Sequence, residues 1–113
     1  MNKPMASNIS TSLIISTYNR SDALELCVKS VLRQSLLPDE IIIADDGSKE
    51  ETGELIHQLA TTSVVPIIHV WHEDLGFRLA TIRNKAIVKA TKEYIIQIDG
   101  DIVLHKDFVK DHV

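Results

Sequence analysis

The chain has 113 residues, 44% of them hydrophobic and 25% charged, with a formal net charge of −4 at pH 7. This length suits one domain, and such a chain can bury roughly two thirds of its unfolded surface. The negative charge argues against nucleic acid as a main partner, and no apolar run approaches the ~20 residues of a membrane span, so we expect a cytoplasmic protein or one held peripherally at the inner membrane face.

The first half of the chain alternates apolar runs with amphipathic segments. Residues 1–10 are polar without periodicity and predict a flexible leader. Residues 12–16 predict a buried strand, followed by a helix over 22–34 with Ser21 as its N-cap and Cys27 as a small core residue on its apolar face. Residues 40–44 predict a second strand, and Ser48 with Glu51 matches a capping box that opens a helix to about residue 60.

The second half repeats this pattern. Residues 67–71 predict a short strand, and a helix runs from residue 77 or 78 to about 92. The nearly continuous apolar run 94–98 is typical of a strand buried on both faces, and residues 106–113 begin another helix. This alternation predicts an α/β fold, with a Rossmann-like, mainly parallel sheet that carries helices on both faces.

Polar clusters follow three of the predicted strands, at residues 17–19, 45–46 and 99–101. Because ligands of such sheets bind beyond the carboxyl ends of the strands, these clusters predict a ligand site. Asp99 and Asp101 are spaced to reach one point, and Gly100 between them leaves the turn unhindered and admits a close ligand. Paired carboxylates suit Mn²⁺ or Mg²⁺, although Asp-Gly is also an ordinary turn sequence.

Four ordered motifs together resemble family 2 glycosyltransferases, in the nucleotide-binding half of their GT-A fold. The resemblance covers about residues 11–113. The segment 74–78 is similar to that of bacterial polysaccharide and chondroitin-polymerase-like members, which transfer N-acetylhexosamine, hexose or glucuronic acid units. The motifs are Ile15-Ser16-Thr17-Tyr18-Asn19-Arg20, Ala44-Asp45-Asp46-Gly47-Ser48, Gly76-Phe77-Arg78 with Arg83-Asn84, and the DxD motif Asp99-Gly100-Asp101.

The resemblance implies a site for a nucleoside-diphosphate sugar, and we expect the UDP form. At the matching positions, Tyr18 would pack on uracil and Asp46 would accept a hydrogen bond from its ring N–H. Ser16 and Asn19 would support this pocket. His69 and His72, which flank Trp71 at the end of the third strand, would tune packing or the pocket rim rather than bind metal.

The remaining motif residues would serve the diphosphate and the metal. Arg78 would reach the diphosphate or the base, and Arg83 would pair with phosphate or with a DxD carboxylate, while Asn84 would bond a loop. Asp99 would contact ribose or sugar hydroxyls and share the metal, and Asp101 would ligate the Mn²⁺ or Mg²⁺ that bridges both phosphates.

The resemblance also implies what this segment leaves out. An inverting family 2 enzyme takes its general base from a position that would lie beyond Val113, so we expect donor binding without transfer to a saccharide acceptor. Residues 94–98 would then form an open sheet edge through which the chain forms a homo-oligomer. Two alternatives are a nucleotide-binding module without catalysis and a response-regulator receiver domain, whose acidic pair should follow the first strand.

Overall fold

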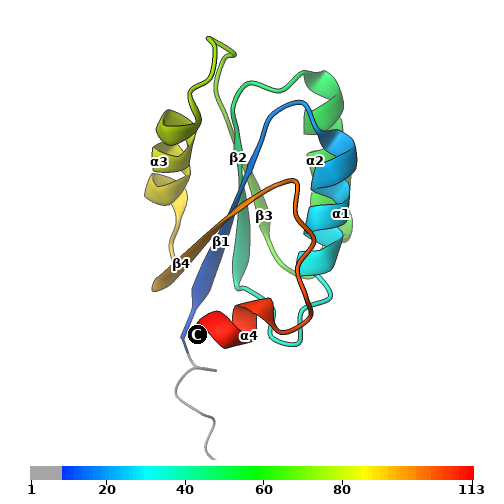
Figure 1. Cartoon of the computed structure of the whole chain (residues 1–113), viewed down its shortest axis with the longest axis vertical. Coiled ribbons are helices and arrows are strands. Elements are labelled where there is room, and N and C mark those ends of the chain that lie inside the picture. Colours follow the sequence, from blue (N-terminus) through cyan, green and yellow to red (C-terminus); the bar gives the residue numbers. More distant parts are fainter. Residues whose placement is uncertain (1–8) are drawn as a thin grey trace, which may run out of the picture.

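A computed structural model describes residues 9–113. Strands and helices alternate along the described chain, and all strand pairs are parallel. In sequence the elements are β1 (Thr11–Thr17), α1 (Ser21–Val31), β2 (Glu40–Asp45), α2 (Glu50–Thr62), β3 (Ile67–Trp71), α3 (Leu79–Lys89), β4 (Tyr94–Asp99) and α4 (Phe108–His112). Figure 1 shows α3 on one face of the sheet and α1 and α2 on the other. The predicted parallel sheet with helices on both faces is confirmed.

The strand order in the described sheet is β3-β2-β1-β4. Doubly wound nucleotide-binding sheets begin with this order. A receiver domain has its first strand between the second and the third. Here β2 lies between β1 and β3, so the receiver alternative is wrong.

Each face of the sheet has its own core. The larger one joins α1, α2 and α4 to the sheet, and the smaller one lies under α3. The residues that β1 and β2 contribute are almost all fully buried, since helices cover both of their faces. The larger core includes Leu13, Ile15, Leu24, Cys27, Val28, Val31, Ile41, Ile43, Ile56, Ile96, Ile98 and Val109, and the smaller one includes Ile14, Ile42, Ala44, Val70, Ile82 and Ala86.

The predicted two-sided burial of the last strand is wrong. In β4, Ile96 and Ile98 are buried in the larger core, but Tyr94, Ile95 and Gln97 are exposed. The reason is the position of α3, which packs over β1, β2 and β3. Since β4 lies at the edge of the described sheet, its face with Ile95 and Gln97 has none of the described helices above it. Tyr94 lies on the same face as Ile96 and is exposed at the start of the strand.

Both predicted N-caps are also wrong. Helix α1 begins at Ser21 itself, and the side-chain oxygen of Ser21 instead lies 3.4 Å from Glu51 Oε1 on α2. Helix α2 begins at Glu50 after Lys49, without a side-chain cap. The Ser48 hydroxyl is used elsewhere, because it accepts a hydrogen bond from the backbone N–H of Asn19 at 2.8 Å.

The segment after β4 is tied back to α1. Ser30 Oγ accepts a hydrogen bond from the N–H of Leu104, and the Gln34 amide bonds both the His105 carbonyl and the Val109 N–H. Of the predicted leader, residues 1–8 lie outside the described residues, while the Ser10 carbonyl accepts the Tyr94 N–H at 3.0 Å. Among the helices that the structure describes, none has the length and apolarity needed to span a membrane.

Candidate functional site

The carboxyl end of β1 organises the two acidic turns. The Thr17 carbonyl accepts the N–H of Asp46 at 3.0 Å, and the Ser16 carbonyl accepts the N–H of Gly100 at 2.7 Å. Since β1 lies between β2 and β4 in register, these bonds bring the end of each neighbour to the same edge of the sheet. The clusters that the sequence predicted at one edge do meet there.

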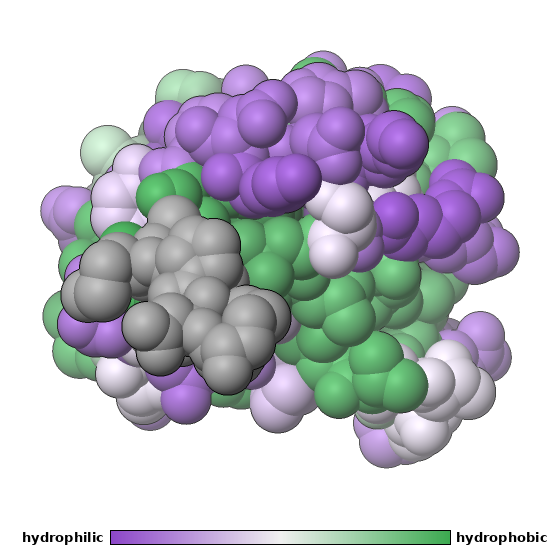
Figure 2. Space-filling model, turned by 90° about the horizontal axis from the view of Figure 1, so that it is seen from below, coloured by the Kyte–Doolittle hydropathy of each residue, from purple (hydrophilic) through white to green (hydrophobic). Residues whose placement is uncertain are grey.

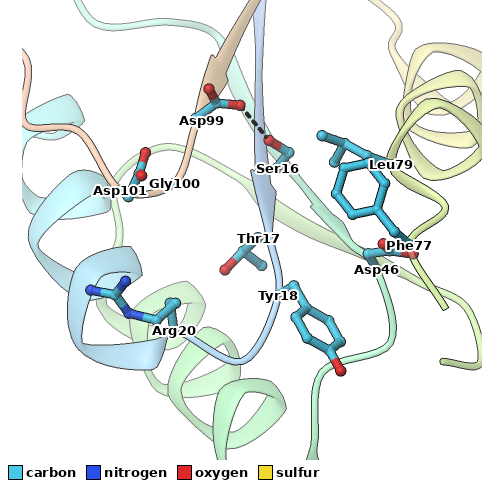
Figure 3. A pocket seen from close by; sticks show the side chains of 10 residues that line it. All are labelled: Ser16, Thr17, Tyr18, Arg20, Asp46, Phe77, Leu79, Asp99, Gly100 and Asp101. Atoms are coloured by element: carbon cyan, nitrogen blue, oxygen red, sulfur yellow. Dashed lines mark hydrogen bonds between the residues drawn. The ribbon is translucent and has the colours of Figure 1, made fainter.

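An open pocket of about 310 Å³ lies between these turns. Figure 3 shows the DxD turn on one side and Asp46, Phe77 and Leu79 on the other, with the end of β1 between them. Of the predicted site residues, those that line this pocket are Ser16, Tyr18, Asp46, Asp99 and Asp101. A smaller pocket of about 130 Å³ adjoins it, lined by Tyr18, Asp46, Asp74, Gly76 and Phe77.

Asp99 is held by two partners through one oxygen. Its Oδ1 accepts bonds from Ser16 Oγ at 3.1 Å and from an Arg83 guanidinium nitrogen at 2.7 Å. Of the two roles that we gave Arg83, the structure therefore shows the pairing with a DxD carboxylate. The Arg83 charge offsets one of the two negative charges of the turn, and Asp99 Oδ2 keeps its acceptor sites for a ligand.

Asp101 stands at the opposite end of the DxD turn. Its side chain lines the pocket and is exposed, and within residues 9–113 its carboxylate has no hydrogen-bond or ion-pair partner. Gly100 lines the pocket between the two carboxylates. A Cβ placed on it would lie 2.6 Å from the Ser16 carbonyl oxygen, so the glycine also allows a close approach of the protein backbone.

Asp46 is 3% exposed and is oriented from two directions. Its Oδ1 lies 2.6 Å from His72 Nε2, and its Oδ2 accepts the backbone N–H of Arg78 at 3.0 Å. The neighbouring Asp45 is fully buried and points the other way, where it bonds Ser48 N–H and His69 Nε2. Only Asp46 of this acidic pair lines the pocket between the acidic turns.

Tyr18 bridges two loops at the rim of the pocket. Its hydroxyl donates to Asp74 Oδ2 at 2.7 Å, and the side chain is about half exposed. This hydrogen bond raises the pKa of Tyr18 and lowers the pKa of Asp74, since it favours the neutral phenol beside the charged carboxylate. The ring is thus held between the turn after β1 and the loop before α3.

Asn19 joins the turn after β1 to the turn after β2. Besides the bond from its N–H to Ser48, its Oδ1 accepts the N–H of Lys49 at 2.8 Å. Its φ is 48°, a left-handed conformation that asparagine tolerates better than most residues. Asn19 therefore supports the pocket from outside, without lining it.

Other pocket residues were missed from the sequence. Thr17 is 7% exposed, and its hydroxyl is a buried polar atom without a hydrogen-bond partner among the described residues. Arg20, Phe77 and Leu79 also line the pocket. Thr17, Arg20 and Phe77 belong to quoted motifs, which were the available signal, whereas Leu79 enters only through the fold of the loop after β3. The Arg78 side chain, expected near the diphosphate or base, is not among the lining residues.

Comparison with known proteins identifies the family. The model of "Glycosyl transferase family 2" matches residues 12–113. The chain belongs to this family. The Escherichia coli chondroitin synthase is 31% identical to this family 2 chain over 103 residues, which are 90% of the chain and 15% of that protein. The chain thus spans a small part of the length of this relative.

Solved structures share the GT-A fold of this family 2 chain. Staphylococcus aureus TarS (residues 1–349, in complex with UDP) superposes with a TM-score of 0.73 at 22% identity, over 92% of this chain and 31% of that one. The Pyrobaculum calidifontis mannosyltransferase PcManGT, in complex with GDP-Man and Mn²⁺, gives a TM-score of 0.72 at 24% identity, over 82% of this chain and 28% of that one. The predicted GT-A half is therefore confirmed at the level of fold.

Proposed function

We propose that this family 2 chain forms the donor site of a glycosyltransferase that moves a sugar from a nucleoside-diphosphate sugar, UDP-linked, to a saccharide acceptor with inversion. The observation that carries the proposal is the pocket between the two acidic turns, with Asp46 and Tyr18 at one end and Asp99 and Asp101 at the other. The complexes of TarS with UDP and UDP-GlcNAc support this choice of donor. Together with the family, the chondroitin synthase relative supports a role in polysaccharide synthesis.

The two ends of the pocket suit the two ends of a nucleotide. At one end, Asp46 offers acceptor atoms and Tyr18 an aromatic face, which fit a base with a ring N–H. In the middle lies Thr17, whose hydroxyl is buried without a hydrogen-bond partner among the described residues. Arg83 would serve the diphosphate end through its pairing with Asp99, and Arg78 the base end through its backbone bond to Asp46.

The donor set of the DxD turn fits Mn²⁺ or Mg²⁺. No group of three or more His, Cys, Asp or Glu side chains within residues 9–113 is arranged to hold a metal. Mg²⁺ does not need one, because it is commonly bound by one or two carboxylates together with substrate phosphates. Asp101 and Asp99 would hold the ion, and its charge would stabilise the leaving nucleoside diphosphate. The chain's own residues position Asp99 and keep Asp101 accessible.

Calorimetric titration of the 113-residue chain tests the proposal. UDP should bind more tightly than ADP or GDP, and only weakly without Mn²⁺, because the carboxylates of the DxD turn repel a diphosphate when no cation intervenes. Equal affinities for the three nucleotides, or affinities that do not change with metal, would contradict it. With donor bound, we expect no transfer to an acceptor from this chain, since we place the general base beyond Val113. We further propose that the protein works in the cytoplasm or at the inner membrane face.

Two substitutions separate the ends of the pocket. Asp101→Asn should abolish the effect of Mn²⁺ on UDP binding and leave the fold intact, because the side chain is exposed and makes no hydrogen bond or ion pair within residues 9–113. Asp46→Asn should reduce the preference for UDP and keep the metal effect, since an amide can present a donor where the base requires an acceptor. If the two variants behave alike in calorimetry, the assignment of roles is wrong.

A further inference from the structure

A row of three polar side chains lies behind the base end of the pocket. His72 follows β3 and is 7% exposed, with Nε2 at 2.6 Å from Asp46 Oδ1. Its other ring nitrogen, Nδ1, lies 3.3 Å from Nζ of Lys85 on α3. His72 lines neither pocket, so it acts on any ligand through Asp46.

The chemistry of the two neighbours fixes the ring's protons. A lysine ammonium only donates hydrogen bonds, so Nδ1 of His72 must accept from Lys85. Nε2 of the ring then carries a proton, which points at Asp46 Oδ1. His72 is thereby a donor to Asp46.

Two donors from different segments therefore orient the Asp46 carboxylate. His72 holds Oδ1 and the Arg78 N–H holds Oδ2, so rotation of the carboxylate would break both bonds. Each carboxylate oxygen has two lone pairs, so one on each remains beyond these bonds. What Asp46 presents to the pocket is an acceptor in a fixed orientation.

Resting on the proposed function, we propose that His72, oriented by Lys85, is a positioning residue that makes this site select the nucleobase. Held as a fixed acceptor, Asp46 favours a pyrimidine whose ring nitrogen carries a proton, as in uracil. It disfavours cytosine, which presents an unprotonated nitrogen at the same place. A purely structural His72 would contribute to stability but not to the ratio of the affinities for UDP and CDP.

The first test is titration of the 113-residue chain with UDP and with CDP, in the presence of Mn²⁺. His72→Leu should lose about tenfold in UDP affinity, the size of a hydrogen bond to a charged group, with little change for CDP. His72→Gln should retain most of the preference, because its amide N–H replaces that of Nε2. Lys85→Met should lower the ratio of UDP to CDP affinity less than His72→Leu does, since the exposed lysine acts only through the His72 ring.

The structure supplies a matched control. His69 makes the same kind of bond to the neighbouring Asp45, from Nε2 to Oδ2 at 2.8 Å, but Asp45 is fully buried and faces away from the pocket between the turns. His69→Leu should therefore lower thermal stability and leave the UDP to CDP ratio unchanged. If His69→Leu and His72→Leu change the ratio equally, the inference is wrong.

A second measurement does not depend on nucleotide binding. Long-range ¹H–¹⁵N spectra should show His72 as the tautomer protonated on Nε2 in the free chain, and in Lys85→Met this preference should weaken. A ring protonated on Nδ1 overturns the inference even if UDP binds.

If UDP binds and all variants keep the wild-type ratio, this inference fails while the proposed function stands. If wild type binds neither nucleotide, the proposed function fails and the base selectivity fails with it, whatever the tautomer. If His72→Leu does not fold, the inference is tested by the UDP to CDP affinity ratios of His72→Gln and Lys85→Met and by the tautomer of His72.

Discussion

Gly100 shows how closely the turn after β4 approaches the end of β1. Its N–H donates to the Ser16 carbonyl, and a methyl group at its Cα would lie 2.6 Å from the same oxygen. Gly100→Ala must therefore push the DxD turn away from β1. We expect a loss of about 1–3 kcal/mol in the free energy of unfolding, as for other overpacked sites, and weaker Mn²⁺-dependent UDP binding.

A second glycine provides the control for this prediction. Gly53 lies within α2, and a Cβ there would meet only His69 Cε1 at 3.8 Å, an ordinary contact. Gly53→Ala should raise stability by about 0.5–1 kcal/mol through helix propensity, with UDP binding unchanged. Urea unfolding of both variants measures the difference, and a Gly100→Ala chain as stable as wild type would contradict the close approach.

At the scale of single residues, the sequence predicted which residues form the site better than it predicted which of them bond to one another. The acidic turns and Tyr18 could be predicted because they follow strand ends in recognisable motifs, and the pairing of Arg83 because it belongs to the motif around α3. The bond from His72 to Asp46 could not, since it joins residues 26 positions apart whose distance depends on how the loop after β3 folds. The close contact of Gly100 with the Ser16 carbonyl was missed for the same reason, because only the sheet register places that carbonyl beside it.

At the level of elements, a buried carboxylate joins β2 to the connection between α3 and β4. Glu40 is 5% exposed and accepts bonds from Ser12 Oγ at 2.6 Å and from both the N–H and the hydroxyl of Thr91. Burial acts to raise the pKa of Glu40, but these hydrogen bonds outweigh it and lower the pKa below its ordinary value of 4.5. The charged form thus stabilises the connection between α3 and β4.

This arrangement predicts a pH-dependent stability. A carboxyl with a lowered folded pKa contributes stability that is fully present above its unfolded value of 4.5, and that is lost as pH falls through the folded pKa. At neutral pH, Glu40→Gln should cost about 1–3 kcal/mol, because its amide leaves at least one donor unmatched. The difference from wild type in urea unfolding should narrow in acid. A difference that stays constant down to about pH 3 would contradict the prediction.

The existence and type of each element followed from periodicity, but their ends did not. Every predicted strand is present, because runs of β-branched residues bounded by polar turns have few other solutions. Ser21 and Ser48 were assigned as caps from local pattern, yet both hydroxyls bond segments distant in sequence. Tertiary contacts therefore override the local signal at the point where the site is assembled.

For the whole molecule, the open edge of β4 is the feature that most favours self-association. In the described sheet, β4 pairs only with β1, and Tyr94 and Ile95 are 39% and 36% exposed. Figure 2, which views the end of the molecule opposite the pocket, shows apolar surface in the middle of that face. An uncovered strand edge beside apolar side chains favours pairing with another chain.

We therefore expect the 113-residue chain to associate at micromolar concentration through β4. Ile95→Lys should shift sedimentation toward the monomer, because a charge on the exposed face of an edge strand opposes pairing. Val64→Lys is the control, since Val64 is 82% exposed and lies between α2 and β3, outside this edge. A wild-type chain that sediments as a monomer would show that the edge is protected.

Cys27, the single thiol of the sequence, lies in the larger core directly beneath the DxD turn. It is fully buried, its Sγ lies 3.9 Å from the Asp99 carbonyl oxygen, and burial raises its pKa to about 11. A thiol reagent can reach it only when α1 and the turn separate. The rate at which the reagent labels Cys27 thus reports how often the site opens. Bound UDP with Mn²⁺ should lower this labelling rate in proportion to the occupancy of the site. Labelling that ignores saturating nucleotide would mean that the thiol is reached by a motion that leaves the pocket intact.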